Sequence, residues 1–241
     1  MDAEVGPNSH REAGARSGAP RRQSREVRPK VAVDVVLFAM REWRLKCYLV
    51  QLRSGPAAGR WAFPGRLIRV GELLDEAARG ELELSTGIRA SYLEQLRTFG
   101  DPTRDPQAHV VSVGYLALSG KREESAGGSQ KYSSGQWFEI AELPPLAYDH
   151  GLMAACALER LKSKLEYTNI ACSLLPQRFT FAEVEEVYET VLARDLDRRN
   201  LRRRIFAMGL LRQLPETRRG QGRPAALYEF VRGDVQAIEM L

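Results

Sequence analysis

Carboxylates on one predicted helix are the residues of this sequence best suited to metal chemistry. The helix is predicted to begin near Glu72 and to end at Gly87, and residues three and four apart share a helix face, so positions 81, 84 and 85 project together. Only Glu81 supplies a carboxylate there, because the other two residues are Leu84 and Ser85. Mg²⁺ needs several hard oxygen ligands. We therefore expect metal binding to be weak or absent, and we assign neither a metal nor a cofactor to the chain.

The stretch from Trp61 to Ile88 reads WAFPGRLIRVGELLDEAARGELELSTGI and resembles the Nudix box of Mg²⁺-dependent nucleoside diphosphate pyrophosphohydrolases. In that box a Gly, five residues, a Glu and seven residues lead into Arg-Glu-apolar-X-Glu-Glu-X-Gly-apolar. Glu72 and Glu81 match box carboxylates, whereas Leu84 and Ser85 replace the Glu pair and Arg66 replaces the leading Gly. The resemblance, with these losses, implies a fold kept for binding: no catalytic residue is assigned, and the chain is predicted not to be an enzyme.

The composition limits the class of protein. The chain has 241 residues, a net charge of +5 and a pI near 9.2, so one large or two small domains and an anionic partner fit it. Three widely spaced cysteines, Cys47, Cys156 and Cys172, are predicted to be buried free thiols in a reducing compartment. No run approaches the roughly 20 apolar residues that cross a bilayer. We expect a cytoplasmic protein without membrane contact.

The chain divides into four predicted segments. Residues 1–29 are rich in Gly, Ala, Pro, Ser and Arg and are predicted to be a disordered basic leader, either solvated or in electrostatic contact with nucleic acid. Residues 30–147 combine apolar strand runs with the helix of the box, as in an α/β sandwich. Residues 148–168 form a connecting helix, and residues 169–241 form a winged helix-turn-helix domain. The predicted fold class is therefore α/β followed by a winged helix.

Apolar patterns predict the elements of the sandwich. Strands are expected at VAVDVVLFAM, LKCYLVQL, Tyr92–Phe99, HVVSVGYLALS and QWFEI, with KREESAGGSQKYSSG as a polar surface loop. The box helix should pack on the sheet through Leu74, Ala77, Ala78, Leu82 and Ser85. The connecting helix, from Asp149 to Tyr167, should use Leu152, Met153, Cys156, Leu158 and Leu161, and we expect it to transmit signals between the domains.

Capping and charge patterns indicate that the C-terminal third binds DNA. Thr180 and Glu183 have the spacing of a capping box, and a second helix should begin at Asp197 and end at Gly209. The predicted strands Leu210–Leu214 and Ala225–Phe230 follow it. Nine arginines and one acidic residue lie between positions 198 and 223. A basic helix and a basic hairpin are typical of winged-helix DNA binding. The alternative is an Arg-rich face that packs on the acidic residues of the preceding helix, Glu183, Glu185 and Glu186.

From about Val31 to Phe230 the chain resembles the NrtR family of Nudix-related transcriptional regulators. The resemblance lies in YLEQLRTFGDPTRDP, LPPLAYDH, LERLKSKLEYTNIACSLLP, RFTFAEVEEVYETVLARDLDRRNLRRRIFAMGLL and GRPAALYEF. It implies a homodimeric repressor that binds double-stranded DNA at a palindromic operator of NAD biosynthesis or salvage genes. It also implies that ADP-ribose or a related NAD metabolite binds the Nudix-like domain and releases the DNA. Two alternatives remain: a Nudix hydrolase of ADP-ribose or a related nucleotide, and a sugar-responsive regulator of the same architecture.

The resemblance also implies site residues by position. The expected DNA contacts are Arg198, Arg199, Asn200, Arg202, Arg203, Arg218, Arg219, Gln221 and Arg223. The expected effector contacts are Arg53, Arg66, Glu72, Glu81, Arg104 and Asp105. Loop-bracing ion pairs are the alternative role for Arg53, Arg104 and Asp105, and helix-terminal or loop-holding carboxylates for Glu72 and Glu81. We further hypothesise that Arg66 supplies the positive charge that Mg²⁺ provides in an intact box.

Overall fold

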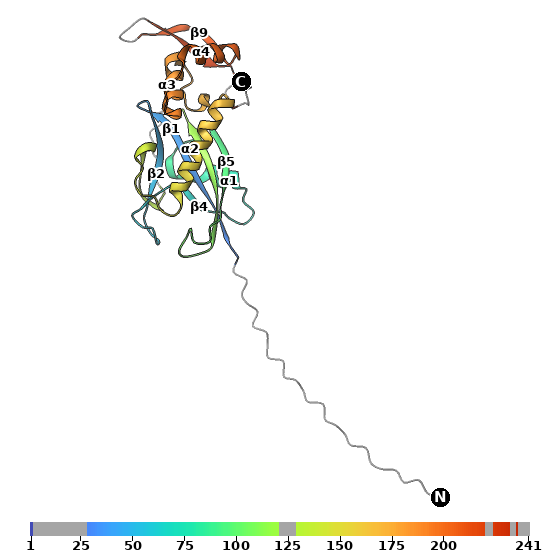
Figure 1. Ribbon diagram of the computed structural model, residues 1–241. Coiled ribbons are helices and arrows are strands. Elements are labelled where there is room, and N and C mark those ends of the chain that lie inside the picture. Colours follow the sequence, from blue (N-terminus) through green and yellow to red (C-terminus); the bar gives the residue numbers. More distant parts are fainter. Residues whose placement is uncertain (2–27, 121–128, 220–223, 232–234, 236–241) are drawn as a thin grey trace.

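The computed structural model describes residues 1, 28–120, 129–219, 224–231 and 235, and within them most strands belong to one mixed sheet (Figure 1). The central strands β1 and β6 run parallel, and the order across the sheet is β3-β2-β1-β6-β5, with β4 paired to β1 and β7 paired to β2. The strands of this sheet are β1 (Lys30–Arg41), β2 (Arg44–Leu52), β3 (Trp61–Ala62), β4 (Gly65–Leu67), β5 (Tyr92–Phe99), β6 (Val110–Ser119) and β7 (Tyr132–Glu139).

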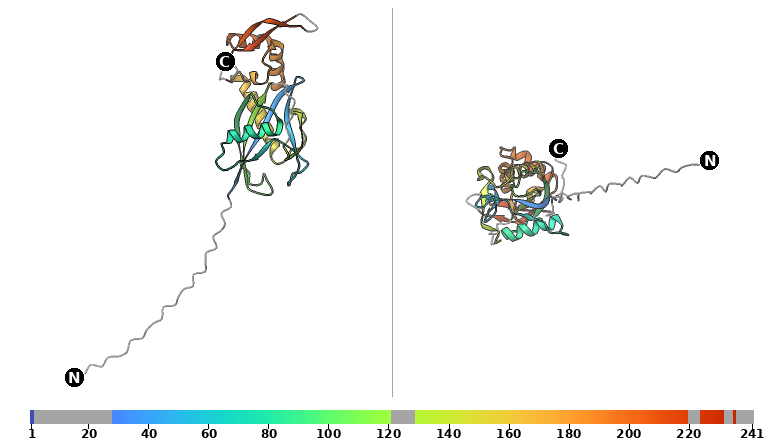
Figure 2. Two further views of the ribbon diagram at one scale, coloured as in Figure 1. Left: turned by 180° about the vertical axis from the view of Figure 1, so that it is seen from behind. Right: turned by 90° about the horizontal axis from the view of Figure 1, so that it is seen from below.

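Two helices cover opposite faces of the sheet (Figures 1 and 2). Strand β1 alternates its side chains: Val33 and Val35 belong to the core under α1 (Leu74–Thr86), and Val36 belongs to the core under α2 (His150–Tyr167). Helix α1 ends at Gly87 with a left-handed φ of 70°, a conformation that favours glycine. The predicted α/β sandwich is confirmed, with β1 as the strand that separates its two cores.

Two details of the predicted sandwich are wrong. Strand β7 starts at Tyr132, four residues before the predicted start, because backbone pairing with β2 extends through exposed serines that have no apolar period. Residues 121–128 of the predicted polar loop lie outside the described residues, as do residues 2–27 of the predicted leader. In α2, Leu152 is 54% exposed, and Ala154, Ala157 and Leu165 complete the buried face instead.

The C-terminal part is a winged helix. Its core helices are α3 (Phe181–Leu192) and α4 (Arg198–Ala207), and its sheet has the order β8-β10-β9, formed by β8 (Phe179–Thr180), β9 (Leu211–Arg218) and β10 (Ala225–Phe230). Both predicted caps are confirmed: Thr180 and Glu183 form a capping box, and the Asp197 side chain accepts the Asn200 N–H at 3.0 Å. Two short 3₁₀ turns, η1 (Ile140–Glu142) and η2 (Ile170–Ser173), complete the described elements.

The two parts share one hydrophobic core. A continuous cluster of buried side chains runs from Phe38 and Leu116 of the large sheet, through Leu161 of α2, to Val184 and Ile205 of the winged helix. Cys47 is buried in this cluster, which raises the pKa of its thiol to about 12, whereas Cys156 and Cys172 are only partly buried, so the prediction of three buried thiols holds for one. The winged helix is therefore packed against the sandwich rather than hung from a loose linker.

We expect Gly120→Ala to destabilise this joint. A methyl group at position 120 would lie 2.2 Å from the backbone oxygen of Leu175, which cannot rotate away. Overpacking of this kind costs about 1–3 kcal/mol of unfolding free energy, measurable as a lower thermal unfolding midpoint. Gly80→Ala in α1 is the control, because nothing lies within 4 Å there and Ala is favoured over Gly in a helix by up to about 1 kcal/mol. An unchanged midpoint for Gly120→Ala would contradict this close approach.

Candidate effector and DNA sites

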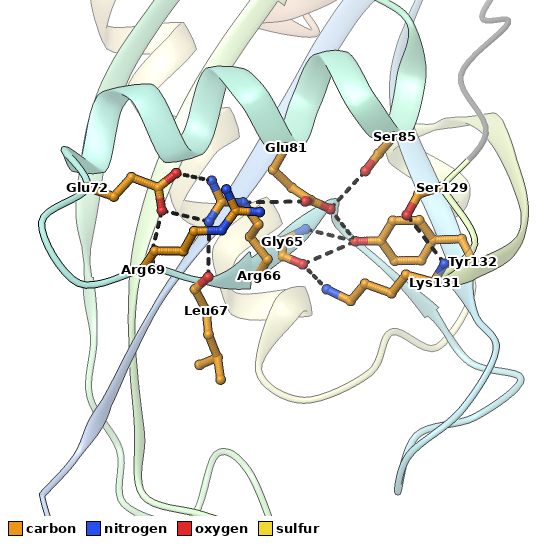
Figure 3. Close-up of polar contacts among 10 residues, drawn as sticks. All are labelled: Gly65, Arg66, Leu67, Arg69, Glu72, Glu81, Ser85, Ser129, Lys131 and Tyr132. Atoms are coloured by element: carbon orange, nitrogen blue, oxygen red, sulfur yellow. Dashed lines mark hydrogen bonds and ion pairs between the residues drawn. The ribbon is translucent and has the colours of Figure 1, made fainter.

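Arg66 joins the two remaining box carboxylates. Pairing of β4 with β1 sets Arg66 opposite Val33 and so on the α1 face of the sheet. Its guanidinium donates through Nη1 to Glu72 Oε2 at 2.8 Å and through Nη2 to the other Glu72 oxygen (Figure 3). Its Nε lies 3.8 Å from Glu81 Oε2. A cation of the protein itself therefore lies between the box carboxylates.

Glu81 is buried and held by hydroxyl groups. It is only 3% exposed, and its Oε1 accepts hydrogen bonds from Ser85 Oγ at 2.8 Å and from the Tyr132 hydroxyl at 2.7 Å (Figure 3). The same tyrosine oxygen accepts the Gly65 N–H at 3.2 Å. Burial, with the Glu81 charge beside it, raises the pKa of Tyr132, so this hydroxyl keeps its proton and remains a donor. Strand β7, strand β4 and helix α1 thus meet at one carboxylate.

The electrostatics keep Arg66 and Glu72 charged. Hydrogen bonds from Arg66, and then from the Arg69 N–H at 2.9 Å, lower the pKa of Glu72 to about 2. The Glu72 hydrogen bonds in turn raise the pKa of Arg66. Both partners are therefore ionised at neutral pH.

The residues present do not fit a Mg²⁺ ion. Ser85 uses its hydroxyl on Glu81, Leu84 is 58% exposed, and Glu72 is already engaged by a guanidinium. Within the described residues, no group of three or more His, Cys, Asp and Glu side chains is placed to hold a metal ion. Hard cations need such an oxygen cluster, and here the Arg66 guanidinium contacts both remaining box carboxylates.

A cavity of about 310 Å³ lies beside the end of α1. Arg53, predicted as an effector contact, lines it and donates to the Tyr132 backbone oxygen at 3.0 Å. Most of the residues that line the cavity carry hydroxyl groups. Apart from Arg53 they were not predicted as contacts, because residues 129–135 were assigned to a loop. The lining residues are Tyr48, Val50, Arg53, Ser85, Ser129, Gln130, Tyr132, Ser133, Ser134 and Gly135.

Arg104 and Asp105 do not join this cleft, contrary to the predicted grouping. Arg104 is buried and pairs with Asp149 at 2.7 Å and with Asp34 at 3.5 Å. Asp34 follows Val33 in β1, so its side chain lies on the other, α2 face of the sheet. Asp105 accepts the Gln107 N–H within its own loop at 2.8 Å. These contacts match the alternative role, loop bracing, and separate both residues from Arg66.

The predicted DNA contacts that the structure describes lie on α4 and at the end of β9, in the winged helix (Figure 1). Arg199, Arg203 and Arg219 are exposed there, and Arg203 donates to the Asn200 side chain at 2.9 Å. Arg202 stacks over Phe181 at 4.8 Å. Gln221 and Arg223 lie outside the described residues.

Two of the predicted arginines form ion pairs with acidic side chains of α3. Arg198 pairs with Glu189 at 2.8 Å, and Arg218 pairs with Glu183 at 2.7 Å. For Arg198 and Arg218 the structure therefore matches the alternative, in which arginines pack on acidic side chains of the preceding helix. Glu183 was among the acidic residues predicted for this role, and Glu189 was not. Of the other α4 arginines, Arg199, Arg203 and Arg204 are exposed, whereas the Arg202 guanidinium lies over Phe181 and Phe206.

Comparison with known proteins matches both parts of the chain. Residues 28–155 match the NUDIX domain family, and residues 171–230 match the NrtR DNA-binding winged helix domain. The chain is 32% identical over 209 residues to the ADPR responsive transcriptional repressor NtrR of Acinetobacter baylyi, which covers 86% of this chain and 84% of that protein. The chain belongs to the NrtR family.

Solved structures of this family agree with the fold. Shewanella oneidensis NrtR in complex with a 27mer DNA has a TM-score of 0.74 and 32% identity over 83% of this chain and 93% of that chain. The NUDIX domain of the same protein in complex with ADP ribose has a TM-score of 0.53 and 33% identity over 56% of this chain and 89% of that chain. The predicted family and fold class are thus confirmed. Within the described residues of this NrtR-family protein, no helix is long and apolar enough to span a membrane.

Replacing Arg66 should change how stability depends on pH. The folded-state pKa of Glu72 is lowered from 4.5 to about 2, so its stabilisation is present above pH 4.5 and is lost as pH falls toward 2. In Arg66→Gln that pKa should rise toward 4.5, and the variant should lose less stability over this range. Carboxyl NMR titration measures the pKa, and thermal unfolding at several pH values measures the stability.

Arg69→Gln is the matched control for this titration. Arg69 acts on Glu72 mainly through its backbone N–H, which the substitution keeps. A pKa of Glu72 that rises equally in both variants would contradict the role assigned to the Arg66 guanidinium.

Proposed function

We propose that this protein is an ADP-ribose-responsive transcriptional repressor of NAD biosynthesis or salvage genes, acting in the cytoplasm as a homodimer on a palindromic operator. The observation that carries the proposal is the combination, in one chain, of a basic winged helix with a Nudix domain whose box carboxylates are held by Arg66. Three similarities support the proposal: Shewanella oneidensis NrtR was solved with a 27mer DNA, its NUDIX domain was solved with ADP ribose, and the Acinetobacter baylyi relative is an ADPR responsive transcriptional repressor. The proposed protein has the domain limits predicted from the sequence, and α2 connects its two domains.

The proposed DNA contacts lie on α4 and on the wing, which is the hairpin formed by β9 and β10. Helix α4 enters the major groove, where Asn200 pairs with an adenine edge and Arg199, Arg202 and Arg203 contact guanines or phosphates. Arg219 and the end of β9 follow the backbone or the minor groove. The exposure of Arg199, Arg203 and Arg219 supports this arrangement. Two α4 helices in a dimer read half-sites about one helical turn apart.

The effector of the proposal binds on the α1 face. A diphosphate requires cations, and the bidentate geometry of guanidinium groups suits it. Arg53 lines the hydroxyl-rich cavity, which accommodates a ribose, and Arg66 directly follows Gly65, whose N–H bonds to the Tyr132 hydroxyl of the cavity wall. These two arginines supply the cations. Since Arg66 provides the charge, effector binding should not require Mg²⁺. Arg66→Gly should weaken ADP-ribose binding measured by calorimetry, and wild-type binding that depended on Mg²⁺ while Arg66→Gly bound normally would exclude this role.

DNA binding should depend on ADP-ribose. Fluorescence anisotropy of the purified protein with its own upstream DNA, at fixed salt, should show specific binding that ADP-ribose reverses. Specific binding unmoved by ADP-ribose would keep the repressor and direct the search to sugars as effectors. Binding without sequence preference would contradict the proposal itself.

Hydrolysis should be absent. Phosphate release from ADP-ribose in Mg²⁺, measured after phosphatase coupling, should remain at background, because Leu84 and Ser85 replace the Glu pair. The double variant Leu84→Glu, Ser85→Glu tests whether the rest of the site is competent. Turnover by the wild-type chain would favour the alternative, a Nudix hydrolase of ADP-ribose or a related nucleotide.

A further inference from the structure

Helix α3 holds one arginine from each DNA-binding element. From α4, Arg198 donates to the Glu189 carboxylate through Nε at 3.0 Å and Nη2 at 2.8 Å. From β9, Arg218 donates through Nη1 to both oxygens of Glu183, at 2.7 and 2.8 Å. Two independent ion pairs thus connect one helix to the start of α4 and to the base of the wing.

In both pairs the carboxylate is the covered partner. The Glu183 and Glu189 side chains are 13% and 20% exposed, whereas Arg218 and Arg198 are 45% and 60% exposed. Arg218 also donates through Nη2 to the Arg178 backbone oxygen at 2.9 Å. The donor groups of both guanidiniums are therefore directed toward the protein, while their remaining surface faces solvent.

Carboxylate and phosphate compete for the same guanidinium donors, because both accept the planar Arg fork. A phosphate that approaches Arg198 or Arg218 has to displace a glutamate that is already in place. Non-specific affinity for DNA grows with the number of phosphates that the protein neutralises. Restraining two arginines therefore weakens non-specific binding to phosphates. It affects the base contacts made by the exposed part of α4 less.

We propose that Glu183 and Glu189 are positioning residues that restrain Arg218 and Arg198 and so limit non-specific DNA binding. The inference rests on the proposed DNA-binding function. Sequence preference then comes from the unrestrained residues of α4, and the two restrained arginines reach phosphates only when the rest of the interface fits. The ratio of specific to non-specific affinity is the property that this arrangement sets.

Glutamine variants test the restraint without unfolding α3. In Glu183→Gln the capping box is retained, because Gln is accepted at that position of the box, and Thr180 keeps its partner at 2.6 Å. Glu189→Gln removes the carboxylate that Arg198 hydrogen-bonds and leaves only the more distant Glu185 carboxylate, 4.0 Å from Arg198 Nη1. The matched control is Glu186→Gln, which makes the same charge change on the same helix at a residue whose charge acts on Arg198 without an ion pair among the described residues. Thermal unfolding confirms that each variant is folded.

The experiment compares binding to the protein's own upstream DNA and to a scrambled duplex across a salt series. Glu189→Gln and Glu183→Gln should bind the scrambled duplex roughly tenfold more tightly, with a slope of log affinity against log salt steeper by about 0.9 for one additional phosphate contact. Glu186→Gln should show a smaller gain and an unchanged slope. Equal behaviour of Glu189→Gln and Glu186→Gln would overturn the inference.

A second arm separates this inference from the proposed function. The double variant Glu189→Gln, Arg198→Gln should return the salt slope to the wild-type value, and a slope that stays steep would show that Arg198 is not the released cation and would overturn the inference alone. Wild-type protein that does not prefer its own upstream DNA to the scrambled duplex would overturn the proposed function and the inference with it.

Discussion

Glu81 is nearly excluded from water, and a buried carboxylate has to be hydrogen-bonded or paired within the protein. Three elements provide this: Arg66 from β4, Ser85 from α1 and Tyr132 from β7. Arg66 is part of the chain, so side chains of the protein itself balance the Glu81 carboxylate and connect β4, α1 and β7. Two of these side chains, Ser85 and Tyr132, also form the wall of the neighbouring cavity.

The same domain contacts the winged helix through a strained turn. Glu42 and Trp43, at the tip between β1 and β2, have left-handed φ values of 53° and 58°, which are costly for a bulky side chain. The Trp43 carbonyl oxygen accepts a hydrogen bond from Thr190 of α3 at 3.4 Å. Thr190 directly follows Glu189, so the domain contact and the restraint on Arg198 lie on adjacent residues. Helix α3 therefore joins the predicted connecting helix α2 as a link between the domains.

Much of the fold could be predicted from local sequence patterns. The rest depends on pairing between residues that are far apart in the chain. The capping box at Thr180, the glycine end of α1 and the strand Tyr92–Phe99 depend on residues close in the chain, and each was predictable. The role of Tyr132 depends on backbone pairing of β7 with β2. The serines and the glycine at the start of β7 have no apolar pattern from which this strand could be predicted. The separation of Arg104 from Arg66 depends on which face of β1 Asp34 occupies, a parity that appears only once β1 is paired with β4.

Strand β2 connects the cavity to the winged helix without a break. Tyr48 and Val50 line the cavity, and the turn at Trp43 immediately precedes the other end of the strand. A strand inside a shared core bends little, because packed cores are not continuously deformable. A signal passes along it more readily when the core can adopt either of two packing arrangements. The effector shifts that choice only by its difference in affinity for the two arrangements. Moving the DNA-competent fraction from 99% to 1% needs a difference in affinity of about 10⁴-fold. In the proposed dimer the demand on each subunit would be smaller, because one misplaced α4 spoils the joint fit to two half-sites.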